Sequence, residues 1–343
     1  MGIIIKYKTF TSIGYTILNE QLCLHKKSEL PFVGWVPHAP NIIIIIIIAA
    51  GRSLSLKFNL VSQFSHCGAH LWHFHTNLRG SRVYWQPQFL PHVDVSHEWD
   101  AKTGHGTDGW GNHELQNYTD QPQNAFHTQD GRLVLRAVAN HSASDADQKY
   151  TSARLVSKQT LAHDRGVLSA VILSPCAEGI WPAFWLLPQE PFVWPTDGEI
   201  DIAETWNGDA ENHSCLHWGQ HDQPDRHRIR GTRIPDMRQR PVQYDFVWEQ
   251  PGGEAGRGRM IWYIDGRPVM KATVPAGTRP LRDMTVLLNV AMGGNVCQGK
   301  VPREGAYDMV VYAMSMAHEM ENGGWGRFEY DWGHPAVREG DTY

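Results

Sequence analysis

Three acidic residues stand close together in the segment Gly198-Glu-Ile-Asp-Ile-Ala-Glu204, with no basic residue between them. Two close carboxylates on a rigid element are what glycosidic bond cleavage requires, because one attacks the anomeric carbon and the other protonates the leaving oxygen. Crowding of like charges raises the proton affinity of one member, so an acid and a nucleophile are present at the same pH. The segment alone leaves two interpretations open: this chemistry, or the commoner solvated acidic face.

The element that must position these carboxylates is a β-strand. Because side chains alternate along a strand, Glu199 and Asp201 share one face while the isoleucines beside them point into a core. Glu204 lies at an odd offset from Glu199, so we predict a β-bulge near Ala203 that returns Glu204 to the face of the other two. Such a bulge predicts carboxyl groups about 5 to 5.5 Å apart, the retaining arrangement, rather than the roughly 6.5 to 9.5 Å of inverting enzymes.

Aromatic residues precede the acidic strand, in Gly179-Ile-Trp-Pro-Ala-Phe-Trp-Leu-Leu-Pro188 and in Trp194-Pro195. Indole faces stack on the apolar faces of sugar rings, and the indole edge can hydrogen-bond hydroxyl groups. Trp181 and Trp194 adjoin prolines at the ends of elements, where exposure is favoured, whereas Phe184 is predicted to lie in the core. Trp181 and Trp194 are therefore candidate sugar contacts.

The pattern G-x-W-P-A-x-W followed by E-x-D-x-x-E resembles glycoside hydrolase family 16, in particular its β-1,3-glucanase, or laminarinase-like, branch. Further segments that resemble the family are Gly109–Thr119, Leu216–Gly219, Trp262–Gly266 and Leu288–Gly294. The resemblance implies a retaining mechanism in which Glu199 resembles the nucleophile and Glu204 the acid/base. Asp201 resembles the carboxylate that hydrogen-bonds the nucleophile and tunes its protonation.

The resemblance also implies a set of residues that contact the sugar or support those contacts: Trp194, Asn112, Glu114, Arg154 and His217. The chemistry needs no metal, and Tyr312 stands where the family usually carries an aspartate that helps bind calcium. We therefore expect a polysaccharide as partner, with neither a metal nor a cofactor. The open alternatives are a hydrolase of mixed β-1,3/1,4-glucans or of another polysaccharide such as galactan, and a non-catalytic β-glucan-binding lectin.

Short apolar or alternating runs separated by Gly, Pro and Asp predict strands over Arg132–Val138, Val167–Leu173, Gly198–Glu204, Met260–Ile264, Thr285–Val290 and Met309–Met314. No long segment has helical periodicity. The composition fits an all-β fold, and the resemblance makes it a concanavalin A-like jelly-roll β-sandwich of two antiparallel sheets. The arginine-rich stretch 226–240 also contains Pro, Gly and Asp, which favours a solvated loop beside the cleft.

The domain organisation that we expect is a poorly folded or misassigned segment over residues 1–90, a catalytic sandwich over 91–320 and a C-terminal tail over 321–343. Residues 42–48 are all isoleucine, a run too short to span a bilayer, which takes roughly 20 residues. Residues 76–94 show no clear candidate for the family's first outer strand. The cluster His66, Cys67, His70, His73 and His75 matches no familiar zinc spacing, so no zinc site is expected there.

Composition bounds the remaining possibilities. A net charge of -5 argues against a nucleic-acid binder, and a hydrophobic fraction of 41% suffices for a full core. The five cysteines form no recognisable spacing, and the sequons at Asn117, Asn140 and Asn212 are compatible with secretion. We expect a monomer, extracellular or in the cell wall by family resemblance, without a membrane span and without a recognisable signal peptide.

Overall fold

The computed structural model describes residues 9–10, 15–16, 43–44, 60–61, 82–253 and 258–343. The chain divides into two units, residues 1–76 and residues 77–343. In the first unit, β1 (Thr9–Phe10) pairs with β2 (Tyr15–Thr16), and β3 (Ile43–Ile44) pairs with β4 (Leu60–Val61). The cysteine–histidine cluster and most of the isoleucine run lie outside the described residues.

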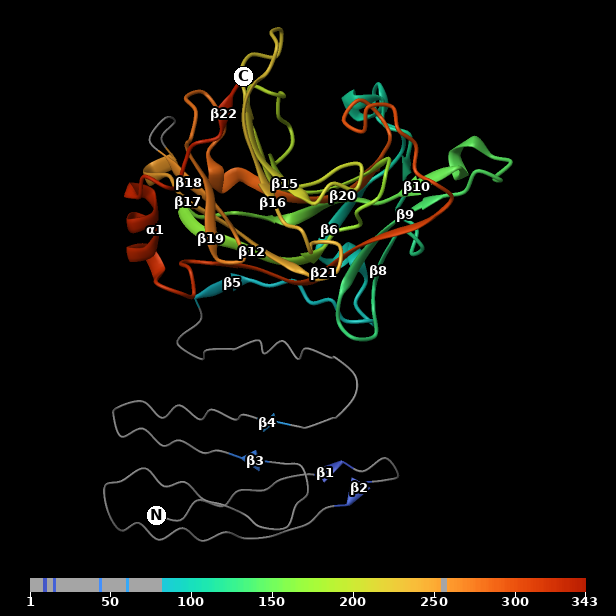
Figure 1. The fold of residues 1–343 in the computed structure, drawn as a ribbon, viewed down its shortest axis with the longest axis horizontal. Coiled ribbons are helices and arrows are strands. Elements are labelled where there is room, and N and C mark those ends of the chain that lie inside the picture. Colours follow the sequence, from blue (N-terminus) through green and yellow to red (C-terminus); the bar gives the residue numbers. More distant parts are fainter. Residues whose placement is uncertain (1–8, 11–14, 17–42, 45–59, 62–81, 254–257) are drawn as a thin grey trace. The chain divides into compact units, whose positions relative to one another are not determined.

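The second unit consists of two sheets that pack face to face (Figure 1). The ten-stranded sheet has the order β19 (Arg267–Thr273), β18 (Arg259–Ile264), β17 (Val242–Glu249), β12 (Arg165–Leu173), β21 (Gly305–Ala317), β9 (Leu133–Ala139), β10 (Tyr150–Ser152) and β7 (Asn117–Tyr118), with β5 (Val83–Trp85) beside β21 and β8 (Ala125–His127) beside β9. The eight-stranded sheet has the order β22 (Asp341–Thr342), β16 (Arg226–Arg233), β15 (Glu211–Trp218), β14 (Glu199–Glu204), β13 (Ile180–Pro188), β20 (Met284–Met292), β11 (Arg154–Thr160) and β6 (Trp99–Lys102). Among the described strand pairs only β10 and β7 are parallel. The predicted all-β jelly-roll sandwich is confirmed.

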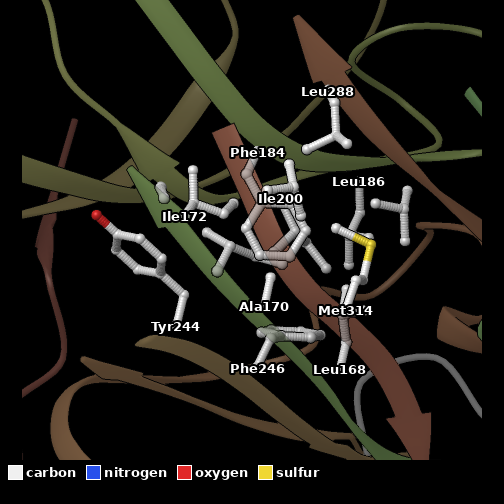
Figure 2. Packing of buried hydrophobic residues seen from close by; sticks show 14 of the residues in the cluster. Leu168, Ala170, Ile172, Phe184, Leu186, Ile200, Tyr244, Phe246, Leu288 and Met314 are labelled. Carbon is white, nitrogen blue, oxygen red and sulfur yellow. The ribbon is translucent and has the colours of Figure 1, made fainter. Parts of the chain in front are cut away.

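The core lies between the two sheets. Figure 2 shows its centre, where Leu168 and Phe246 of the ten-stranded sheet lie near Phe184, Leu186 and Ile200 of the eight-stranded sheet. Alternation along each strand decides which side chains enter this layer, because residues two apart share a face. The prediction that Phe184 is a core residue is confirmed, since it is fully buried.

The outer face of the ten-stranded sheet carries a second apolar cluster, covered by helix α1 (Gly324–Gly333). Val167, Val247 and Ile261 point outward between core residues and pack with Phe328 of the helix. The sequence did not predict this helix. Its stability comes from packing on the sheet, as is usual for a helix of ten residues.

Two sequence interpretations are wrong. Residues Arg226–Arg233 form strand β16 rather than a loop, because backbone pairing with β15 along its whole length holds a sequence that has little apolar alternation. Residues 76–94 do supply an outer strand: β5 pairs with β21, and its Trp85 is buried in the core. Three residues are too few for a clear alternating pattern.

The remaining short helical turns are η1 (Val95–His97), η2 (Gly109–His113), η3 (Ala146–Gln148), η4 (Pro251–Gly253) and η5 (Leu281–Asp283). In the part of the chain that the structure describes, no helix has both the length and the apolar character needed to cross a membrane. Cys176, Cys215 and Cys297 are free thiols. The sequon residue Asn212 is buried and donates to the carbonyl of Ile202, so it is not a surface site.

Candidate active site

Strand β14 contains the predicted bulge. Asp201 pairs with Trp185 of β13 and Ala203 pairs with Phe184, so Ile202 is the extra residue without a partner on β13. Ile202 and Ala203 consequently both face the core. Glu204 pairs with Ala183 and returns to the outer face of the eight-stranded sheet. The bulge therefore brings Glu199, Asp201 and Glu204 onto one face, as the sequence predicts.

Indole donors hold the two glutamates. Nε1 of Trp194, in the loop before β14, donates to Oε2 of Glu199 at 2.9 Å. Nε1 of Trp181, on β13, donates to Oε1 of Glu204, also at 2.9 Å. Trp181 is half-buried and Trp194 is 42% exposed, so each indole holds a carboxylate while the residue remains partly open to solvent.

The electrostatic environments of the two glutamates differ. Burial, followed by the charge of Asp201, raises the pKa of Glu199 to about 8, while His217 and Arg154 act in the opposite direction. Burial raises the pKa of Glu204 well above its ordinary value, and two anions, Asp201 and Glu199, add to the effect. Glu204 has two anionic neighbours and one cationic neighbour, so this environment favours the proton on Glu204 and the charge on Glu199.

Asp201 is 1% exposed, and its carboxylate oxygens accept no hydrogen bond from any described residue. Its cationic neighbour is His217 of β15, whose Nε2 lies 3.3 Å from Oδ2 of Asp201. Nδ1 of His217 faces Oδ2 of Asp225 at 2.7 Å. Burial opposes the charged imidazole, but contacts with Asp201 and Cys215 and the charge of Glu199 outweigh it and raise the pKa of His217.

A cross-strand row extends the site from β14 to β11. Glu204, Ala183, Asn289 and Arg154 pair in succession, so Arg154 lies on the same face as the carboxylates. Cζ of the Arg154 guanidinium lies over two indoles, 4.4 Å from the Trp110 ring centroid and 4.7 Å from the Trp185 ring centroid. Beside it lies a groove of about 470 Å³, whose lining includes Lys102, Trp110, Arg154, Leu187, Phe192 and Leu287.

The segment from Gly109 to Gln116 borders this face at the end of β20. Glu114 is buried, and Gln116 donates to its Oε2 at 2.6 Å; burial raises the pKa of Glu114. The carbonyl of Asn112 accepts from the backbone N–H of Asn295 at 2.8 Å. At Gly294 the backbone has a φ of 71°, and a Cβ there would come 2.5 Å from this same carbonyl, so the close approach requires glycine.

The residues singled out from the sequence fall into two groups around this face. Glu199, Asp201, Glu204, Trp181, Trp194 and His217 are joined by contacts on β13, β14, β15 and the loop before β14. Arg154 reaches Glu199 and Glu114 through its charge, while Asn112 and Glu114 belong to the border segment. Sequence reasoning missed Asp225 and His227, which are brought beside His217 by a loop and by strand pairing, and no sequence motif marks them.

Comparisons with known proteins find a family and relatives that the chain resembles. A family described as "XgeA-like, catalytic GH16 domain" matches residues 101–240. The chain is 28% identical over 254 residues to the glucan endo-1,3-beta-glucosidase A1 of Niallia circulans. The aligned region covers 66% of this chain and 36% of that protein. It is 29% identical over 232 residues to the glucan endo-1,3-beta-glucosidase of Cryptopygus antarcticus. That aligned region covers 63% of this chain and 82% of the relative.

A solved structure shares the fold. The laminarinase from Rhodothermus marinus superposes with a TM-score of 0.56 at 27% sequence identity, covering 71% of this chain and 100% of that one. The family match over residues 101–240 includes the bulged strand, the tryptophans before it and the segment that borders the face. Over residues 101–240 the chain is similar to the catalytic domain of glycoside hydrolase family 16.

Proposed function

We propose that the protein is a retaining endo-hydrolase of β-1,3-glucans, with Glu199 as nucleophile and Glu204 as acid/base. The observation that carries the proposal is the bulge in β14, which places both glutamates on one open face, each held by an indole donor. A plain strand would send Glu204 into the core. A fold that only needed surface charge would have no use for this irregularity or for the buried Asp201 between the two glutamates.

In the first step the carboxylate of Glu199 attacks the anomeric carbon, while Glu204 gives its proton to the leaving glycosidic oxygen. A glycosyl ester forms on Glu199, and the shortened glucan leaves. In the second step the Glu204 carboxylate takes a proton from water, the water oxygen attacks the anomeric carbon, and Glu199 is released. Two displacements retain the configuration at that carbon.

Asp201 is suited to a supporting role. It lies between the glutamates on the bulged strand, and its contact with His217 involves only Oδ2, so Oδ1 can accept from a protonated Glu199. Its negative charge also favours the protonated form of both neighbours. His217 balances this charge from β15 and orients Asp201. We assign His217 and the buried Glu114 to supporting the site.

The exposed parts of the site suit a polymer. Trp194 and Trp181 present indole surface next to the two glutamates, and Arg154 and Asn112 lie along the same side of the sheet. The groove of about 470 Å³ continues this face toward β6 and has room for further sugar units. The names of the two curated relatives favour a β-1,3-glucan, with mixed-linkage glucans as a second substrate class.

We further propose that the catalytic domain extends beyond residues 91–320 at both ends and comprises the unit 77–343, because β5, α1 and β22 pair with or pack on its two sheets. We propose that it acts as a monomer outside the cell or in the cell wall, and that the segment before it is misassigned. Size-exclusion chromatography with light scattering tests the monomer. Mass spectrometry of the N-terminus of the natural product tests the first segment, and an intact peptide that contains residues 42–48 would contradict a misassigned start.

The activity is tested on laminarin, lichenan, cellulose and galactan with the purified full chain. We expect sugar release from laminarin by the wild type and by Glu211→Gln, which removes an exposed carboxylate of β15 in the same sheet. Glu199→Gln should be inactive, and Glu204→Gln should lose about 10²- to 10⁴-fold. Equal activity in Glu199→Gln and Glu211→Gln would refute the assignment of the nucleophile.

The same panel separates the alternatives. Release from galactan but not laminarin would indicate another polysaccharide, and laminarin binding without hydrolysis would indicate a lectin. Proton NMR of the first product formed decides the stereochemistry, since a β-anomer from a β-glucan is expected for retention. An α-anomer would overturn the double displacement.

A further inference from the structure

Three side chains of types that ligate metals converge beside the acidic strand, and two of them have no part in the proposed chemistry. They are His217 on β15, His227 on β16 and Asp225, just before β16; their ligand atoms all lie within 4.8 Å of one another. Oδ2 of Asp225 is 2.7 Å from Nδ1 of His217 and 3.5 Å from Nδ1 of His227. One oxygen and two ring nitrogens thus lie close together, with the oxygen nearest to both nitrogens.

The backbone holds the two imidazoles in place. His217 and His227 are direct cross-strand partners, so their rings project from the same face of the sheet, with centroids 5.4 Å apart. His227 is also held from its other side, because its N–H and carbonyl both bond to the backbone of Tyr343, whose ring stacks on the imidazole at 5.3 Å. The site is therefore largely formed before an ion arrives.

A cation can reach one nitrogen on each ring. Nδ1 of His227 is buried and has no hydrogen-bond partner among the described residues. On His217, Nε2 faces Asp201 and the Cys215 sulfur, each at 3.3 Å, and Nδ1 faces Asp225 at 2.7 Å, so a metal ion would bind Nδ1 in exchange for its proton, which is released to solvent. A carboxylate behind a ligating histidine in this way is the usual outer shell of a zinc site.

We propose that His217, Asp225 and His227 form a binding site for a divalent metal ion of the zinc class. Two imidazoles and one carboxylate are ligands that Zn²⁺ prefers, and the fourth position would be filled by water. The ligand side chains are 21% to 33% exposed, so the ion can enter from solvent. Asp201, Asp225 and the neighbouring Glu199 make the surroundings anionic, which favours a cation.

The position of the site has a functional consequence, which rests on the proposed function. Glu199 pairs with His217, and His217 pairs with His227, so a bound ion lies on the face that carries the nucleophile. An ion and its water there would obstruct a glucan lying across β14 to β16. Zinc should therefore inhibit hydrolysis.

The site is tested by titrating the full chain with ZnCl₂ in a calorimeter. His227→Gln should bind one equivalent fewer than the wild type, or bind that equivalent about 100-fold or more weakly. The matched control is His105→Gln, which removes a histidine paired with a single carboxylate, Asp147 at 3.1 Å, and should bind as the wild type does. Any zinc bound by residues 66–75 is common to all three proteins and cancels in the comparison.

Visible absorption of the Co²⁺-loaded protein gives a second readout, since a four-coordinate band should be lost in His227→Gln. Asp225→Asn, with its change in a loop before β16, repeats the test if His227→Gln does not fold. Identical zinc isotherms for the wild type and a folded variant would overturn the site.

With laminarin as substrate, zinc should inhibit the wild type but not His227→Gln. Equal inhibition of the two proteins would overturn the proposal that the ion obstructs the glucan. If the purified full chain has no hydrolase activity, only the proposed function is contradicted, because the calorimetry still measures zinc binding.

Discussion

Trp262 links the two sheets at the bulge. It is a fully buried residue of β18, and its Nε1 donates across the core to the backbone carbonyl of Asp201 at 2.9 Å. This carbonyl immediately precedes the extra residue Ile202, where the sheet ladder is interrupted. The indole therefore satisfies a buried acceptor and fixes the bulge from behind.

The substitution Trp262→Phe keeps most of the ring but removes the donor. A buried carbonyl left without a partner costs about 1 to 3 kcal/mol. At the middle of that range, about 2 kcal/mol, a domain of this size should unfold about 4 to 8 °C lower. Loosening the bulge should also displace Glu199 relative to Glu204, and a displacement of about 1 Å costs up to roughly 100-fold in rate. We expect kcat on laminarin to fall by about 10- to 100-fold.

The matched control is Trp248→Phe. Trp248 is also fully buried in the ten-stranded sheet, and its Nε1 donates to a carbonyl, that of His163, at the same 2.9 Å. Its partner is far from β14 in sequence and belongs to a loop. Calorimetric unfolding should show similar losses for both variants, whereas kcat at 25 °C should fall only in Trp262→Phe. An unchanged kcat in Trp262→Phe, alongside the expected loss in stability, would refute the reasoning that this bond positions the carboxylates.

Three further predictions concern burial. Asn212 should carry no glycan when the chain is secreted from a eukaryotic host, because its side chain is buried, whereas the exposed sequon at Asn140 can be modified; peptide mass spectrometry reads both. Cys215 should resist iodoacetamide in the folded protein even at pH 9, because burial raises the pKa of its thiol to about 12 and leaves little thiolate; rapid alkylation before unfolding would contradict its buried position. Phe328→Ala should cost about 3 to 4 kcal/mol by leaving a cavity under α1, while Tyr330→Ala, 68% exposed on the same helix, should change the melting temperature little; equal losses would mean that the helix does not pack as described.

Short-range sequence patterns predict some of the strands and the bulge of this protein. The alternation of a strand is a period of two, so the odd offset between Glu199 and Glu204 requires a bulge without reference to any other part of the chain. The alternating or continuous apolar runs of the central strands predict β9, β12, β18, β20 and β21. The runs of β9 and β12 alternate over part of their length, whereas β18 and β20 are buried at nearly every residue. Family resemblance then connects the acidic strand with its preceding tryptophans.

Other features depend on what each segment meets in the folded chain. Strand β16 has few apolar residues and exists because β15 offers a backbone edge, and α1 exists because an apolar patch of the ten-stranded sheet lies open to it. The exact bulged residue, Ile202 rather than Ala203, depends on the register with β13.

The sequence by itself determined an all-β fold and an acidic strand whose bulge brings Glu199 and Glu204 to one face, because these follow from short-range alternation and a local motif. The tertiary structure alone decided which groups surround them: the indole that reaches Asp201 from the other sheet, and the cluster of His217, Asp225 and His227. Those residues meet only when separate segments pair and pack, so no spacing along the chain encodes their contact.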